Sequence, residues 1–166
     1  DNELLDALVA PAYDRTLEEV RASHLLVKIG VDPTPEDTLQ AWNKAIAMKE
    51  RITSGEDFAN IARSRGGSDD PSVKDNGGDL GWFSAFMMVY PFEEACYNAE
   101  AGDVVGPIRT RFGYHIIKVT GRRPARGELR CAHIMIRPDD NKGGDEEAKA
   151  KIDAIANELA GGAAFS

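Results

Sequence analysis

The chain has 166 residues, of which 42% are hydrophobic and 29% charged, a composition typical of a globular protein with a buried core. Its formal net charge of −8 argues against nucleic acid and anionic membrane surfaces as main partners. No stretch approaches the length of a membrane-spanning helix, and Cys96 and Cys131 lack metal-ligand spacing. Because the sequence begins at Asp1 with neither an initiator methionine nor a signal peptide, we expect a piece of a longer protein.

Residues 1–20 are predicted to be a helical segment from a preceding domain. Apolar residues recur there at roughly helical spacing. Pro11 interrupts the pattern, which predicts a kink or two short helices. Thr16-Leu17-Glu18-Glu19 has the residue types of a capping box for the second piece.

A strand is predicted over residues 21–29, with Ala22, His24 and Leu26 on one face. A helix follows from about residue 36 to Ser54, and Gly55 ends it. Its predicted buried stripe consists of Ala41, Trp42, Ala45, Met48 and Ile52. A shorter helix is expected from Phe58 onward.

Residues 66–78 are predicted to be an irregular polar loop, a kind of segment that is often functional in a compact domain. It ends in Gly77-Gly78-Asp79, a tight reversal that leads into a short strand over residues 80–83. We expect this strand to form the floor of an apolar groove. Pro91 then opens a helix that runs through Ala99.

Two strands complete the predicted domain, over residues 104–108 and 114–120, joined by a hairpin. His115, Ile117 and Val119 share a face of the second. Helices inserted into a small antiparallel sheet define an α+β domain, predicted over residues 21–121. A linker rich in arginine, proline and glycine is expected over residues 122–128.

The sequence after the linker repeats the start of the domain. Arg130-Cys131-Ala132-His133-Ile134-Met135-Ile136 matches residues 21–27 in position and type. A helix is predicted over residues 145–159, and Gly162-Ala163-Ala164-Phe165 echoes residues 55–58. Residues 129–166 are therefore predicted to be the truncated start of a second copy.

These motifs resemble the parvulin family of peptidyl-prolyl cis-trans isomerases over about residues 21–120. The shared motifs, in family order, are Ser23-His24-Leu25-Leu26, Gly55-Glu56-Asp57-Phe58, Gly77-Gly78-Asp79-Leu80-Gly81, Pro91-Phe92-Glu93 and Phe112-Gly113-Tyr114-His115-Ile116-Ile117. Tandem units preceded by an apolar helix resemble SurA-like periplasmic folding factors. The resemblance implies a four-stranded antiparallel sheet wrapped by helices, a parvulin/FKBP-like fold.

The resemblance also implies a site. His24 and His115 match the paired active-site histidines, and Asp70, with Asp69 as its neighbour, falls near the family's cysteine-or-aspartate position. The expected substrate-binding residues are Leu80, Met88, Phe92, Phe112 and Trp82. If the segment that carries Met87 and Met88 is extended, only one of them can point into the groove.

Two interpretations of the polar residues stay open. The histidines are either a hydrogen-bonded pair that fixes tautomers and sheet geometry or direct participants in proton transfer. Asp70 either polarises the substrate amide, orients His24 or is a solvated loop carboxylate. No metal and no cofactor are expected, because the three histidines, His24, His115 and His133, are too dispersed and isomerisation needs neither.

The function that the resemblance implies is a peptidyl-prolyl isomerase and chaperone domain. It would bind proline-containing segments of unfolded polypeptides in the periplasm or cell envelope. Nucleic acid is not an expected partner, and the domain is not expected to span the membrane. The alternative is a catalytically silent module that only binds unfolded polypeptide, since a fold does not by itself establish activity. The acidic loop with Asp32, Glu36 and Asp37 argues against selection of phosphorylated peptides.

Overall fold

A computed structural model describes residues 2–127, 130–139 and 144–165. The chain divides into two compact units, Asp1–Gly127 and Glu128–Ser166. Along the part that the structure describes, no helix combines the length and apolar character needed to cross a membrane.

The first unit is built on a four-stranded antiparallel sheet, which confirms the predicted α+β class. The strand order is β2-β1-β4-β3. The strands are β1 (Glu18–Lys28), β2 (Asp79–Phe83), β3 (Val104–Thr110) and β4 (Gly113–Pro124). The strands that carry His24 and His115, β1 and β4, are thus the two inner strands.

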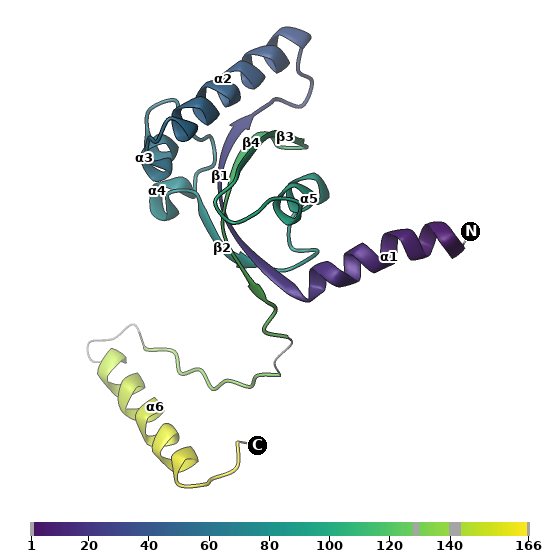
Figure 1. The fold of residues 1–166 in the computed structure, drawn as a ribbon. Coiled ribbons are helices and arrows are strands. Elements are labelled where there is room, and N and C mark those ends of the chain that lie inside the picture. Colours follow the sequence, from purple (N-terminus) through teal and green to yellow (C-terminus); the bar gives the residue numbers. More distant parts are fainter. Residues whose placement is uncertain (1, 128–129, 140–143, 166) are drawn as a thin grey trace. The chain divides into compact units, whose positions relative to one another are not determined.

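Helices cover both faces of this sheet. Figure 1 shows α2, α3 and α4 on one face and α5 on the other. The helices of the unit are α1 (Asn2–Thr16), α2 (Pro35–Thr53), α3 (Phe58–Arg63), α4 (Val73–Asn76) and α5 (Tyr90–Tyr97). The short α4 lies inside the segment that was predicted to be irregular.

The alternation of apolar residues along the strands separates two cores. Leu25, Val27 and Ile116 pack with α2, α3 and α4, whereas Ala22 and Ile117 pack with α5. Because successive side chains of a strand point to opposite faces, His24 and His115 project toward the α5 side. The sequence pattern alone therefore determines on which face the two imidazoles lie.

The ends of α2 follow from local chemistry. Thr34 and Asp37 form a reciprocal capping box at its start, and Pro35 occupies the first turn. Gly55, with φ 98°, ends the helix in the left-handed region. The prediction that Trp42 is buried is wrong: it is 39% exposed and packs edge-on against Tyr114.

The predicted boundary at residue 20 is wrong. One helix continues through Pro11 to Thr16, and β1 begins at Glu18. The Thr16 hydroxyl donates to the carbonyl of Tyr13 instead of capping a second helix. Residues 18–20 join the sheet because β4 extends to Pro124 and pairs with them, so β4 includes residues that were predicted to be linker.

The second unit contains α6 (Gly144–Ala160), where the sequence predicted a helix. Residues 130–139 form neither helix nor strand, although residues 130–136 match residues 21–27, which form part of β1. A strand needs neighbours for its backbone hydrogen bonds. In the first unit, β2 and β4 flank β1, whereas the described residues of the second unit contain no strand that could pair. The assignment of residues 129–166 as the start of a second copy remains a prediction.

Candidate functional site

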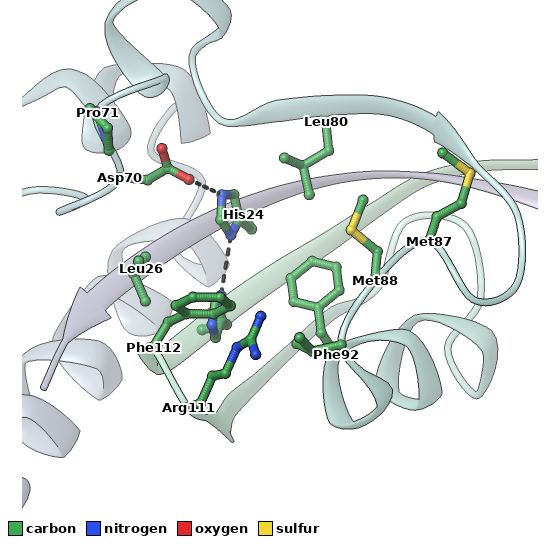
Figure 2. Close-up of a pocket in the computed structure, with 12 residues that line it drawn as sticks. His24, Leu26, Asp70, Pro71, Leu80, Met87, Met88, Phe92, Arg111 and Phe112 are labelled. Carbon is green, nitrogen blue, oxygen red and sulfur yellow. Dashed lines mark hydrogen bonds and ion pairs between the residues drawn. The ribbon is translucent and has the colours of Figure 1, made fainter. Parts of the chain in front are cut away.

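A pocket of about 410 Å³ opens on the α5 side of the sheet. Figure 2 shows the side chains that converge on it from both inner strands, the loops and α5. Its lining consists of His24, Leu26, Asp70, Pro71, Leu80, Met87, Met88, Val89, Phe92, Arg111, Phe112 and His115. Seven of the eight residues that the sequence predicted for the site are among them, and Trp82 is the exception.

A chain of hydrogen bonds crosses the base of the pocket. Nε2 of His24 lies 2.8 Å from Oδ2 of Asp70, and Nδ1 of His24 lies 3.2 Å from Nδ1 of His115 (Figure 2). At the far end, Nε2 of His115 lies 2.8 Å from the hydroxyl of Thr110, which also accepts the backbone N–H of Phe112. Every ring nitrogen of both histidines therefore has a partner.

The partners determine which nitrogens carry protons. An ionised Asp70 can only accept, so Nε2 of His24 is protonated and its Nδ1 accepts from His115. With its proton on Nδ1, a neutral His115 accepts the Thr110 hydroxyl at Nε2. All bonds in the chain then point the same way, toward the Asp70 carboxylate.

The pKa shifts agree with this arrangement. Burial lowers the pKa of His24, although the neighbouring Asp70 raises it in part. Burial, and then the neighbouring His24, lower the pKa of His115 to about 4. Partial burial alone would raise the pKa of Asp70, but hydrogen bonds from Ser72 and the contact with His24 outweigh it and leave the pKa below its usual range. At pH 7 the two imidazoles are neutral and Asp70 is ionised.

Glycine allows the strands to place the histidines. Gly78 has a φ of 92°, and its carbonyl accepts the backbone N–H of His24 at 2.9 Å. A side-chain Cβ on Gly78 would lie 2.6 Å from the carbonyl oxygen of His24, so a larger residue cannot fit without moving the strand. The predicted tight reversal thus positions β2 directly beside the first histidine.

Aromatic and aliphatic side chains wall the pocket. The Phe92 ring is edge-on to both imidazoles, with centroid separations of 5.8 Å to His24 and 5.4 Å to His115. Figure 2 shows Leu80 and Met88 on the same side of the pocket as Phe92, with Phe112 opposite. The imidazoles therefore face a largely apolar space above them.

Trp82 does not contribute to the pocket, contrary to the prediction. Arg21 pairs with Trp82 but Ser23 pairs with Asp79, so β2 contains a bulge between these pairs. Gly81, with φ 71°, lies in the bulge and changes the direction of the following side chains. Leu80 faces the pocket as a result, while Trp82 stacks under the guanidinium of Arg123 at 4.1 Å from its ring centroid.

Sequence reasoning missed three contributions to the site. Thr110, buried beside His115, carries no sequence signal beyond its position at the start of the hairpin. Arg111 gives the pocket edge a cation, and its guanidinium lies over the ring of Phe112. Met87 and Met88 both reach the pocket because residues 85–88 form a turn and are not extended.

Comparisons with known proteins identify the class. A family model described as the PPIC-type PPIASE domain matches residues 12–123. The foldase protein PrsA of Geobacillus kaustophilus (strain HTA426) is 36% identical over 148 residues, covering 88% of this chain and 47% of PrsA. The chaperone SurA of Yersinia pestis bv. Antiqua (strain Antiqua) is 33% identical over 149 residues, covering 87% and 33%. This chain therefore spans half or less of the length of these relatives.

A solved structure gives the same fold. The crystal structure of a PpiC-type peptidyl-prolyl cis-trans isomerase domain matches with a TM-score of 0.60 and 23% identity, over 68% of this chain and 98% of that domain. Fold, pocket and family match together define a parvulin-type peptidyl-prolyl isomerase domain. The chain belongs to the PPIC-type family and is related to the foldase PrsA and the chaperone SurA.

Proposed function

We propose that the pocket binds the proline ring of X-Pro segments in unfolded polypeptides and accelerates rotation about the imide bond without covalent chemistry. The observation that carries this proposal is the fully paired histidine chain beneath an apolar pocket. Each imidazole nitrogen is already hydrogen-bonded, and the hydroxyl beside His115, that of Thr110, is buried and also accepts the backbone N–H of Phe112.

The chemistry requires a lower rotational barrier, which is roughly 18–20 kcal/mol for a peptide bond because of amide resonance. The planar amide is more polar than the twisted transition state. A pocket that excludes water therefore disfavours the planar form relative to the twisted one. Leu80, Met88 and Phe92 supply the apolar surface, and the pocket holds the ring while the preceding chain rotates.

The polar chain supports the first of the two histidine interpretations. His24 and His115 would act as a hydrogen-bonded pair that fixes the base of the pocket, rather than by transferring protons. Both carboxylate oxygens of Asp70 are engaged, one by His24 and one by the backbone N–H of Ser72. We therefore assign Asp70 the role of orienting His24.

The finer biological role is also a proposal. The resemblance to periplasmic folding factors, and the foldase and chaperone names of two relatives, support action on unfolded proteins of the cell envelope. The repeated sequence over residues 129–166 supports a tandem arrangement in the longer protein. Cell fractionation with an antibody to this domain tests the location, and cytoplasmic protein alone would refute it.

Exchange NMR of a short X-Pro peptide tests the activity. We expect cross-peaks between cis and trans resonances to build up faster when the protein is added at substoichiometric amounts. Line shapes that change on binding, without faster exchange, would instead identify the silent binding module. A peptide with alanine in place of proline is the matched control for binding.

A further inference from the structure

The carboxylate of Glu93 is buried and plays no part in the histidine chain. Glu93 is 3% exposed, and its Oε2 accepts the backbone N–H of Phe86 at 2.6 Å. Its other oxygen lies 3.9 Å from the guanidinium of Arg15 in α1. A buried charge is costly unless it is paired, so a carboxylate at this position needs a structural explanation.

The residue that Glu93 contacts has an unusual backbone. Phe86 has a φ of 68° and is the only non-glycine residue with positive φ in the part of the chain that the structure describes. Side chains with a Cβ disfavour this conformation, and it persists only where surrounding contacts enforce it. Phe86 is 74% exposed, so packing of the side chain does not hold the turn.

The turn at Phe86 leads directly into the pocket. The next two residues, Met87 and Met88, both line it, which an extended segment would not allow. The sulfur of Met87 also accepts the backbone N–H of Ser84, which closes the turn from the other side. The conformation of Phe86 therefore determines where Met87 and Met88 lie in the pocket lining.

We propose that Glu93 is a positioning residue for proline binding: its buried carboxylate holds the Phe86 turn in the left-handed conformation that brings Met87 and Met88 to the pocket. Arg15 balances its charge from α1 and stacks beside Tyr90 and Tyr97. The proposal rests on the proposed function insofar as the pocket is the proline site.

A second-site rescue tests this role. Glu93→Ala should raise the dissociation constant for an X-Pro peptide about tenfold. This is the loss of affinity expected when one apolar side chain, here a methionine of the pocket, no longer contacts the bound peptide. Glycine adopts positive φ without strain, so Phe86→Gly removes the strain that the Glu93 contact offsets and should restore affinity in the double variant. Phe86 itself does not line the pocket. Glu93→Gln should also bind, because its amide oxygen can accept the Phe86 N–H.

Glu94→Ala is the matched control. It removes the same charge from the next residue of α5, where the half-buried Glu94 accepts the exposed Tyr90 hydroxyl. We expect its affinity to stay within about twofold of the unmodified protein, as for an ordinary surface substitution. A folded Glu93→Ala variant that binds as well as Glu94→Ala, or a double variant as weak as Glu93→Ala, would overturn the proposal.

Two readouts separate this proposal from the proposed function. The methyl resonances of Met87 and Met88 should shift in Glu93→Ala and return in the double variant, whether or not any peptide binds. In the unmodified protein, the Phe86 amide should exchange with solvent more slowly than the other amides of residues 85–88, despite the exposed side chain. Fast exchange at Phe86 would refute the turn contact without any variant, whereas failure of the unmodified protein to bind X-Pro peptides would refute only the proposed function.

Discussion

The hydroxyl of Thr110 lies 2.8 Å from Nε2 of His115 across the β3–β4 hairpin, and both residues are buried. The same hydroxyl accepts the backbone N–H of Phe112, whose ring lines the pocket. Thr110 therefore connects the histidine pair to the pocket wall, and it sets the tautomer of His115 by donating to Nε2.

Thr110→Val should destabilise the domain by about 1–3 kcal/mol, because it leaves Nε2 of His115 and the Phe112 N–H without a partner. Valine keeps the shape of threonine, so packing is preserved. Urea unfolding measures the change, and ¹⁵N chemical shifts of the imidazoles report the tautomers. Thr120→Val is the control, since the exposed Thr120 hydroxyl bonds only the carbonyl of Arg21. Equal losses of stability for the two variants would show that the hydrogen bonds of Thr110 to His115 and Phe112 do not stabilise the domain.

The neutral histidines make stability depend on pH below 6.5. Unfolded histidine binds a proton near pH 6.5, whereas folded His115 does so only near pH 4. The unfolded state thus holds more protons between these values, and the free energy of unfolding falls as pH is lowered through this window. We expect a loss on the order of 3 kcal/mol from His115.

Denaturant unfolding between pH 7 and pH 4 measures this dependence. The depressed pKa of Asp70 has its effect at lower pH. Its contribution to stability is present above the unfolded pKa and is lost only as the pH falls through the folded pKa. His115→Gln should flatten the curve between pH 6.5 and 4, whereas substitution of the exposed His133 should not. A stability that rises on acidification through this window would show that the histidines are charged in the fold.

Met88→Ala should weaken peptide binding about tenfold and lower turnover in parallel, because Met88 supplies apolar contact to the ring. Calorimetric titration with an X-Pro peptide and exchange NMR measure the two effects. Val31→Ala, at a side chain that is 98% exposed, is the control for loss of an apolar group. His24→Ala, in contrast, should act mainly through stability. Unchanged affinity in Met88→Ala would show that the ring binds elsewhere.

Trp82→Phe should leave peptide affinity within about twofold, because the side chain stacks on Arg123 outside the pocket. Its cost in stability should be less than the about 0.5–1 kcal/mol of an exposed cation–π contact, because phenylalanine keeps a ring face for Arg123. Phe112→Ala, at a residue that does line the pocket, provides the contrast in the same titration. If Trp82→Phe lost more affinity than Phe112→Ala, the bulge in β2 would not turn the Trp82 side chain away from the pocket.

The sequence predicted the parts of the site that follow from simple periodicity. Alternation along the strands placed His24 and His115 on one face, and Gly77-Gly78 marked the turn into β2. Periodicity failed at Trp82, because the bulge at Gly81 breaks the alternation. It also gave no indication of Thr110, whose role depends on a partner brought near by the hairpin.

Other errors came from tertiary contacts that override local signals. Pro11 did not end α1, and residues 18–20 joined the sheet because a longer β4 was available to pair with them. Trp42 lies at a helical position that favours burial, but it packs at the margin of the core against Tyr114. Each case depends on a neighbour that is distant in the sequence.

The histidine pair joins residues 91 positions apart, on adjacent strands that are the first and the last of the four in the sequence. During synthesis, His24 leaves the ribosome long before its partner is made. The groove can then assemble only after β4 has been added between β1 and β3, so no shorter nascent fragment would carry a working site. The domain would thus become competent only when its own chain is complete through this strand.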